Sequence, residues 1–159
     1  MWLKRRTWMN IVVGGLSGSF AVLAGAAAVA PGLPPEPLIL ALVLFLWTPP
    51  HFWSLAIAYR DDYVAAGVPM LPAVIGAKRS AQVVLANAVL LVAASLLPLF
   101  YGAGPLYFAG AAGGGALFIF KAAKLAHDPS RKNAMGSFFA SLVQLSLVLI
   151  AWMIEAALR

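Results

Sequence analysis

Two adjacent carboxylates, Asp61 and Asp62, follow Arg60 at the end of a long apolar run. Carboxylates supply the hard oxygen ligands that Mg²⁺ prefers, and a bound Mg²⁺ can hold the phosphate oxygens of a substrate. The pair can instead be a solvated helix end whose negative charge balances Arg60. The residues alone leave both interpretations open, and the first predicts a metal site for a phosphorylated substrate.

A histidine, His51, lies inside the same apolar run, directly after Pro49 and Pro50. Each proline removes a backbone donor and predicts a kink in a helix, and irregular backbone within a membrane persists only where it faces protein or a water-filled cavity. Because His51, Tyr59 and Asp62 recur at helical spacing, we expect a polar stripe that lines a cavity. A packed, hydrogen-bonded histidine, a substrate contact and a heme ligand all remain open for His51, although an ionisable group inside a span favours function.

Three cations, Lys4, Arg5 and Arg6, precede the first apolar run, and Asn10 lies just inside it. Such a cluster is usually a topology anchor. Anion binding is the alternative, because Arg pairs well with phosphate or carboxylate. The basic cluster at residues 121–132 has no matching polar stripe, and we interpret it as a plain loop.

These candidate residues belong to a chain with the composition of a membrane protein. Of its 159 residues, 63% are hydrophobic and only 10% are charged, whereas about a quarter are charged in an average soluble domain. A soluble domain of this size cannot bury so much apolar surface. The composition therefore excludes a disordered chain and disfavours a water-soluble globule, and the lack of cysteine excludes disulfides.

The charges divide the chain into apolar runs long enough to cross a bilayer, which takes about 20 residues of helix. The run over 80–120 is long enough for two helices, and its turn-forming stretch PLFYGAGP separates them. We predict an all-α, polytopic transmembrane helix bundle in which residues 59–80 form a cytoplasmic loop. The expected spans lie near 11–30, 38–58, 81–100, 104–123 and 134–156.

The basic residues predict the orientation of these spans. Eleven residues are Lys or Arg, and all but Arg159 fall on one side if the N-terminus is cytoplasmic. We therefore expect a bacterial inner membrane protein with its C-terminus outside, and we assign the net charge of +6 to topology rather than to nucleic-acid binding. A cleaved signal peptide ending at Ala28-Val29-Ala30 is the alternative, which Pro31 disfavours.

Small residues four apart predict close helix packing within the membrane. This spacing occurs twice, at Gly14 and Gly18 and again at Gly110 and Gly114. We expect both pairs to lie against a neighbouring helix.

Three stretches resemble, in order and spacing, segments of the heme O synthases (protoheme IX farnesyltransferases) of the UbiA-type intramembrane prenyltransferase superfamily. They are LKRRT followed by NIVVGG, then WTPPHFWSLA, then YRDDYVAAGVPMLP, and together they cover residues 3–72. The resemblance implies an all-helical membrane enzyme with a central cavity. It implies transfer of a farnesyl group from farnesyl diphosphate to a vinyl group of heme B, giving heme O for terminal oxidases, with Mg²⁺ as cofactor.

The resemblance also implies roles for the candidate residues. Asp61 and Asp62 match an acidic motif that binds Mg²⁺ and diphosphate, while His51 and Tyr59 would line the cavity. The candidates for holding diphosphate or heme propionates are Lys4, Arg5, Asn10, Arg60, Lys78 and Arg79. Heme-processing proteins and oxidase assembly proteins would be partners, beside the lipid bilayer.

The chain departs from this family in its acids and its length. The superfamily uses two acidic motifs, yet only Glu36, Asp128 and Glu155 remain after the aspartate pair, and the family has more spans than are expected here. We therefore expect a C-terminal half, truncated and inactive alone, with an N-terminal half missing. A non-catalytic heme- or prenyl-binding subunit and a small multi-pass transporter are the alternatives.

Overall fold

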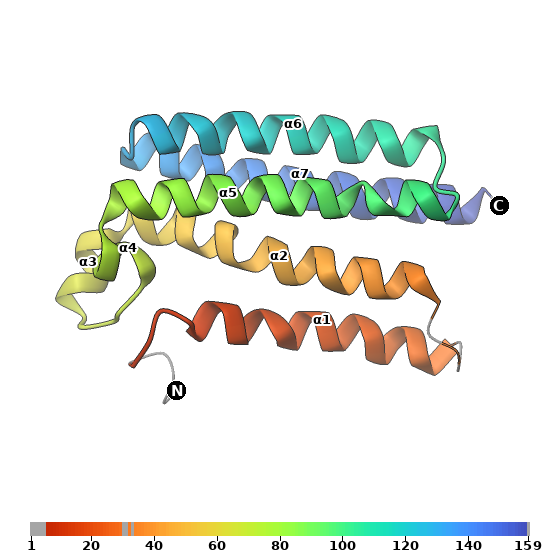
Figure 1. The fold of residues 1–159 in the computed structure, drawn as a ribbon, viewed down its shortest axis with the longest axis horizontal. Helices are drawn as coiled ribbons and strands as arrows, with labels where there is room; N and C mark the ends of the chain where they lie inside the picture. Colours follow the sequence, from red (N-terminus) through yellow and green to blue (C-terminus); the bar gives the residue numbers. More distant parts are fainter. Residues whose placement is uncertain (1–5, 30–31, 33, 159) are drawn as a thin grey trace.

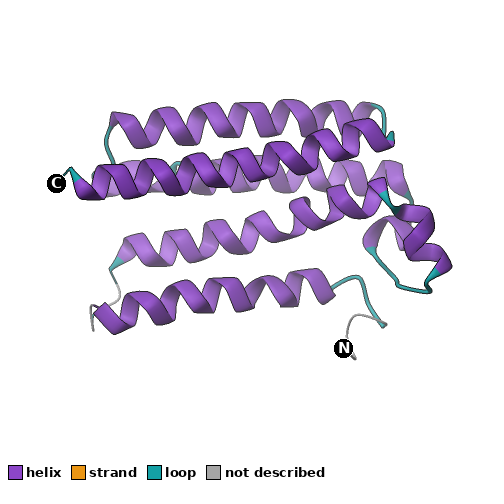
Figure 2. Ribbon diagram, turned by 180° about the vertical axis from the view of Figure 1, so that it is seen from behind, coloured by secondary structure: helices purple, strands orange, loops and turns teal. Residues whose placement is uncertain are grey.

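The computed structural model describes residues 6–29, 32 and 34–158, and within these ranges the protein is all-helical (Figure 1, Figure 2). Lys4 and Arg5 lie outside the described residues. The elements are α1 (Asn10–Val29), α2 (Pro35–Ala58), α3 (Arg60–Ala65), α4 (Leu71–Ile75), α5 (Ala77–Ser95), the 3₁₀ helix η2 (Leu97–Tyr101), α6 (Pro105–His127) and α7 (Arg131–Ala157).

Five of these elements are long and apolar enough to cross a membrane: α1, α2, α5 with η2, α6 and α7. They run alternately up and down the long axis of the molecule, as Figure 1 shows. The prediction of an all-α bundle with five spans is therefore confirmed. The segment expected as a loop over 59–80 instead contains α3, α4 and the first turn of α5, folded against one end of the bundle (Figure 1).

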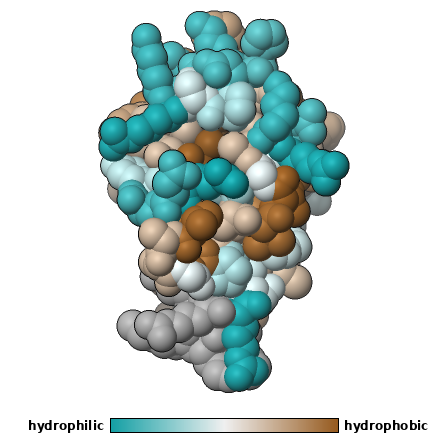
Figure 3. All heavy atoms as spheres, turned by 90° about the vertical axis from the view of Figure 1, so that its left-hand side faces the viewer, coloured by the Kyte–Doolittle hydropathy of each residue, from teal (hydrophilic) through white to brown (hydrophobic). Residues whose placement is uncertain are grey.

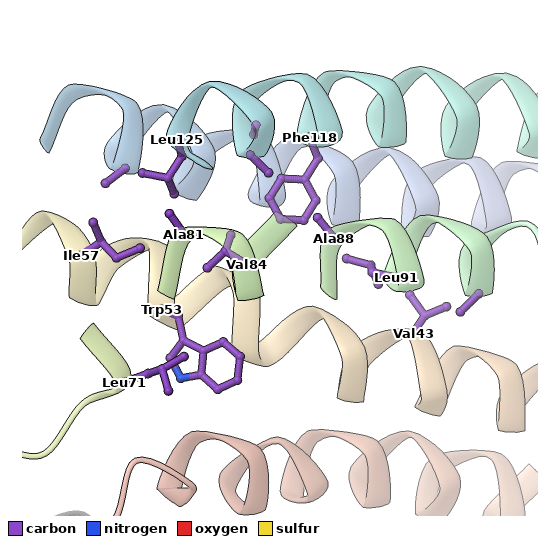
Figure 4. Packing of buried hydrophobic residues seen from close by; sticks show 14 of the residues in the cluster. Val43, Trp53, Ile57, Leu71, Ala81, Val84, Ala88, Leu91, Phe118 and Leu125 are labelled. Atoms are coloured by element: carbon purple, nitrogen blue, oxygen red, sulfur yellow. The ribbon is translucent and has the colours of Figure 1, made fainter. Parts of the chain in front are cut away.

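Helix α2 is the centre of the fold, because it packs against α1, α5 and α7. It stays helical through Pro49 and Pro50, both of which are buried. Its apolar residues meet those of α5 and α6 in one core, where Val43 lies near Leu91, and Phe118 closes the space between α5 and α6 (Figure 4). The helix that carries the prolines and His51 is thus positioned from several sides.

Helix α1 lies at the edge of the bundle and packs against α2 (Figure 1). Only 11% of an 18-residue apolar stretch of α1 is buried, compared with 44% of the corresponding stretch of α2. Its contact with α2 runs through Gly15, where a Cβ atom would lie 3.2 Å from Thr48 Cβ, and through Ser19, whose hydroxyl donates to Ala41 O at 2.8 Å. Most of α1 therefore faces away from the described part of the protein.

The two glycine pairs behave differently. A Cβ atom at Gly110 would lie 3.1 Å from Leu147 O, and one at Gly114 would lie 3.0 Å from Gln144 Cα, so this pair brings α6 close to α7 as predicted. Cβ atoms at Gly14 and Gly18 would meet nothing within 4 Å in the described structure. The prediction of close packing is wrong for Gly14 and Gly18. The residues one position later, Gly15 and Ser19, face α2 instead.

Hydrophilic side chains gather at the end of the bundle where α3 and α4 lie (Figure 3). The exposed charged residues at this end come from α3, the start of α5, the end of α6 and the start of α7. At the opposite end, the turn between η2 and α6 needs Gly102, whose φ of 87° is in the left-handed region. The two ends of the bundle thus differ in charge as the sequence predicts.

Candidate functional site

His51 lies in the interface between α2 and α7, where only 6% of its surface is exposed. Its ring stacks between Trp47 and Phe138, with centroid distances of 4.1 and 4.4 Å. Its Nδ1 atom lies 2.8 Å from Ser141 Oγ, and Phe52 meets the ring edge-on at 5.2 Å. The histidine is therefore held in one orientation by rings on both faces and a hydrogen bond at one edge.

The hydroxyl groups on α7 are functional candidates that the sequence analysis missed. Ser137 Oγ lies 3.0 Å from Ser54 Oγ, one helical turn from the contact between Ser141 and His51. Ser54 in turn donates to Pro50 O at 2.7 Å. The signal for these residues is the four-residue spacing of Ser137 and Ser141 within an apolar span, which matches one helix face.

The expected stripe from His51 to Asp62 is interrupted at Tyr59. This residue ends α2 with φ −118° and ψ 31°, and α3 begins at Arg60. The prediction that one helix carries His51 and Asp62 on a single face is therefore wrong. The Arg131 guanidinium lies 5.1 Å from the Tyr59 ring, so the cluster interpreted as a plain loop contributes a cation to this end of α2.

The aspartate pair lies in the first turn of α3, where both residues are exposed. Asp61 Oδ1 is 3.7 Å from Arg60 Nη1, in an ion pair whose Asp61 side chain is 97% exposed. Such an exposed pair contributes little to stability. In the described structure Asp62 makes no side-chain hydrogen bond or ion pair, so neither carboxylate has a strong structural partner there.

Two of the three remaining acids, Glu155 and Asp128, have clear structural partners. Glu155 accepts hydrogen bonds from the backbone N–H groups of Gly104 and Tyr107 at the start of α6. Asp128 accepts from Ser130 Oγ at 2.9 Å and from Asn133 Nδ2 at 2.8 Å, at the start of α7. Among residues 6–29, 32 and 34–158, no three His, Asp or Glu side chains form a metal-binding group.

Among the basic candidates, Arg60 and Lys78 donate to backbone carbonyl groups, whereas Arg79 is exposed. Arg60 donates from Nε to Pro72 O at 3.0 Å, which holds α3 against α4. Lys78 donates from Nζ to Ala126 O and His127 O, at 2.8 and 2.7 Å, and so caps the end of α6. Arg79 is exposed beside it. The structure thus places all three at the polar end, with Lys78 engaged by the backbone.

A groove of about 380 Å³ runs between α1 and α2. Asn10 lies at one end of it, and its α2 wall is formed by Thr48 and Phe52. Its α1 wall consists mainly of small residues, namely Gly14, Gly15, Ser17 and Gly18, together with Ile11. We call this space the α1–α2 groove; His51 adjoins it through the ring of Phe52.

A second hollow, of about 190 Å³, lies at the opposite end of the bundle. Glu36, Tyr101, Tyr107 and Glu155 are among its lining residues. Glu155 is committed to the start of α6, and Tyr107 donates its hydroxyl to Ser95 O at 2.7 Å. Tyr107 and Glu155 in this hollow therefore serve the packing of the helices, and we take the α1–α2 groove as the candidate site for a ligand.

A bundle of five helices that are long and apolar enough to cross a membrane places the chain in the class of integral membrane proteins. The sequence pattern of the UbiA prenyltransferase family matches residues 1–151. The chain belongs to this family.

Curated relatives agree with this assignment. Protoheme IX farnesyltransferase 2 of Paramagnetospirillum magneticum is 63% identical over 99% of this chain and 55% of its own length. Protoheme IX farnesyltransferase 1 of the same organism is 57% identical over 95% of this chain and 54% of its own length. The chain thus spans about half the length of these relatives.

A solved structure extends the comparison to the fold. Digeranylgeranylglyceryl phosphate synthase matches 92% of this chain with a TM-score of 0.79 and 27% sequence identity, and the match covers 52% of that protein. The helices of this chain therefore adopt the arrangement of part of another membrane enzyme.

Proposed function

We propose that the protein takes part in the transfer of a farnesyl group from farnesyl diphosphate to heme B, the step that forms heme O. The names and 63% identity of the curated relatives support this activity. The observation that carries it is the Asp61–Asp62 pair, because these exposed carboxylates lack strong structural partners while Asp128 and Glu155 hold helix ends.

Mg²⁺ is the cofactor we propose for this pair. The donor set fits, since two adjacent carboxylates on an exposed helix turn are hard oxygen ligands with room for a phosphorylated substrate. When bound, the ion neutralises charge on the departing diphosphate. Further ligands must come from phosphate oxygens, water or other protein groups, because no third carboxylate or histidine joins the pair in the described residues.

The cations at the polar end would hold the anionic parts of the two substrates. Arg60 directly precedes the aspartates and Arg79 lies in the first turn of α5; both are exposed and can bind diphosphate or propionate oxygens. Lys78 would have to leave the end of α6 to do so, and we therefore expect a smaller contribution from it. Lys4, Arg5 and Asn10 would complete the anion pocket from the start of α1.

The α1–α2 groove would hold apolar substrate atoms. Its small residues leave open space within the membrane, and Asn10 at its end is the polar residue that we assign to the anion pocket. We propose that His51 and Tyr59 line the adjoining chamber from α2. A water-poor chamber protects the reactive allylic cation that forms when the diphosphate leaves.

The charge pattern supports an orientation in the bacterial inner membrane. We propose that the end with α3 and α4 is cytoplasmic, as are the residues before α1, and that α7 ends outside. Proteins that process heme or assemble terminal oxidases would receive the product.

The test replaces the matched segment of the 63% identical Paramagnetospirillum relative with this chain, and we call the result the segment-swap protein. It is expressed in a strain that lacks its own heme O synthase, and heme O in the membranes is measured by mass spectrometry. We expect heme O with the native chain and none with Asp62→Ala, because one of the two proposed metal ligands is lost. Asp128→Asn is the matched control and should retain heme O, since Asp128 serves the start of α7.

Two results would contradict the proposal. If a properly inserted segment-swap protein made no heme O, the proposed farnesyl transfer would be contradicted. If the Asp62→Ala variant made near-normal amounts of heme O, the assignment of the aspartate pair as a metal site would be contradicted.

A further inference from the structure

The hydrogen bonds around His51 determine which of its ring nitrogens carries the proton. Ser141 Oγ donates its single proton to Phe138 O at 2.7 Å. The same oxygen lies 2.8 Å from His51 Nδ1, so it must accept a hydrogen bond from that nitrogen. In the neutral ring, a proton on Nδ1 leaves a lone pair on Nε2.

The surroundings of the ring leave Nε2 as its available position. Trp47 and Phe138 cover the two faces of the imidazole, and Trp47 is itself fixed by donation from Nε1 to Ser141 O at 2.8 Å. Nε2 has no hydrogen-bond partner among the described residues. Trp47 and Phe138 cover the faces of the ring rather than its edge, and the edge is the direction from which a metal binds imidazole.

The ring of His51 lies next to a side chain that lines the candidate ligand space. Phe52, which lines the α1–α2 groove, meets the His51 ring edge-on. A neutral imidazole whose other nitrogen donates to a fixed acceptor is the usual form of a histidine that binds a metal. Heme iron commonly takes such a histidine as its axial ligand.

We propose that His51 binds the iron of the heme substrate through Nε2, and that Ser141 is the positioning residue that keeps the proton on Nδ1. This inference rests on the proposed function, because it takes heme as the substrate. Ligation would fix the centre of the porphyrin relative to α2 and leave its rotation about the Fe–N axis to be set by contacts with its edge. The vinyl group would then be selected by those contacts rather than by the iron.

The test uses the 159-residue chain in lipid nanodiscs, titrated with hemin and followed by its Soret absorption and electron paramagnetic resonance. After reduction, the iron–histidine stretching band is recorded by resonance Raman spectroscopy. We expect His51→Gln to lose this band and the histidine-ligated spectrum. We expect Ser141→Ala to weaken heme binding by about 10–100-fold and to shift the band, because the acceptor for Nδ1–H is lost.

Two further variants separate positioning from packing. Ser141→Thr keeps a hydroxyl group and should restore the native band. Ser137→Ala removes a hydroxyl from the same helix that faces Ser54 rather than His51, and should leave the band unchanged.

The outcomes distinguish this inference from the proposed function. Heme that binds with the same spectrum in the native chain and in His51→Gln would overturn ligation while heme binding stands. A native band in Ser141→Ala would overturn the role of Ser141 alone. A native chain that binds no heme would contradict both the ligation and the proposed heme substrate.

Discussion

The two glycine pairs have the same four-residue spacing but opposite surroundings. Gly110 and Gly114 on α6 lie against the backbone of α7, so that there is no room for side chains. Gly14 and Gly18 on α1 face open space and line the α1–α2 groove. The neighbouring residues Gly15 and Ser19 make the contact with α2 instead.

This difference shows what a small-residue spacing can and cannot indicate. Glycine permits a close approach, but the approaching group can be a helix or a ligand. On α6 the space is filled by α7. On α1 the space is open beside Thr48 and Phe52 of α2, which supports its assignment to a substrate chamber.

The largest effect on stability should come from adding a side chain at Gly110 or Gly114, the pair that lies against α7. In Gly114→Leu the new Cβ atom would lie 3.0 Å from Gln144 Cα, so α6 and α7 must separate. We expect a loss of about 3 kcal/mol of stability, the upper range for overpacking, measured by thermal unfolding in detergent. Gly113→Leu is the matched control, since a Cβ atom there meets nothing within 4 Å. Equal stability of the two variants would contradict the packing assignment.

Adding a side chain at Gly14 or Gly18, the pair that lines the α1–α2 groove, should reduce activity and leave the fold intact. Gly14→Leu would place a side chain in the α1–α2 groove without a clash. We expect heme O formation by the segment-swap protein to fall by about tenfold or more, because the substrate competes with the new side chain. Gly25→Leu, also in open space on α1 but outside the groove, should remain active. If both variants kept full activity, the groove would not be part of the chamber.

The smallest effect should come from the hydroxyl that joins α1 to α2. Ser19→Ala removes the donor to Ala41 O. Interhelical hydrogen bonds within membranes average about 0.6 kcal/mol, so we expect a decrease of that size in unfolding free energy. A loss above about 2 kcal/mol, against the same measurement for exposed Ser17→Ala, would show that α1 depends on this contact more than its low burial indicates.

The sequence predicts the five spans well because charges are costly in lipid and therefore mark the ends of helices. It fails at Tyr59, where no Gly or Pro signals the end of α2, and where the bond from Arg60 to Pro72 O draws α3 toward α4. It identifies His51 but not Ser141, because their contact joins residues 90 positions apart. The roles of Asp61 and Asp62 remain a prediction from the motif, supported by their exposure.

The most direct test of the account measures farnesyl transfer by the purified segment-swap protein in nanodiscs, with heme B, farnesyl diphosphate and increasing Mg²⁺. Heme O is quantified by mass spectrometry for the native chain and for a variant with Asp61→Asn and Asp62→Asn. We predict a saturable dependence on Mg²⁺ for the native chain and a rate lower by about 10²-fold or more for the variant. Heme O formation that is independent of Mg²⁺, or a variant with a near-native rate, would contradict the assignment of the aspartate pair.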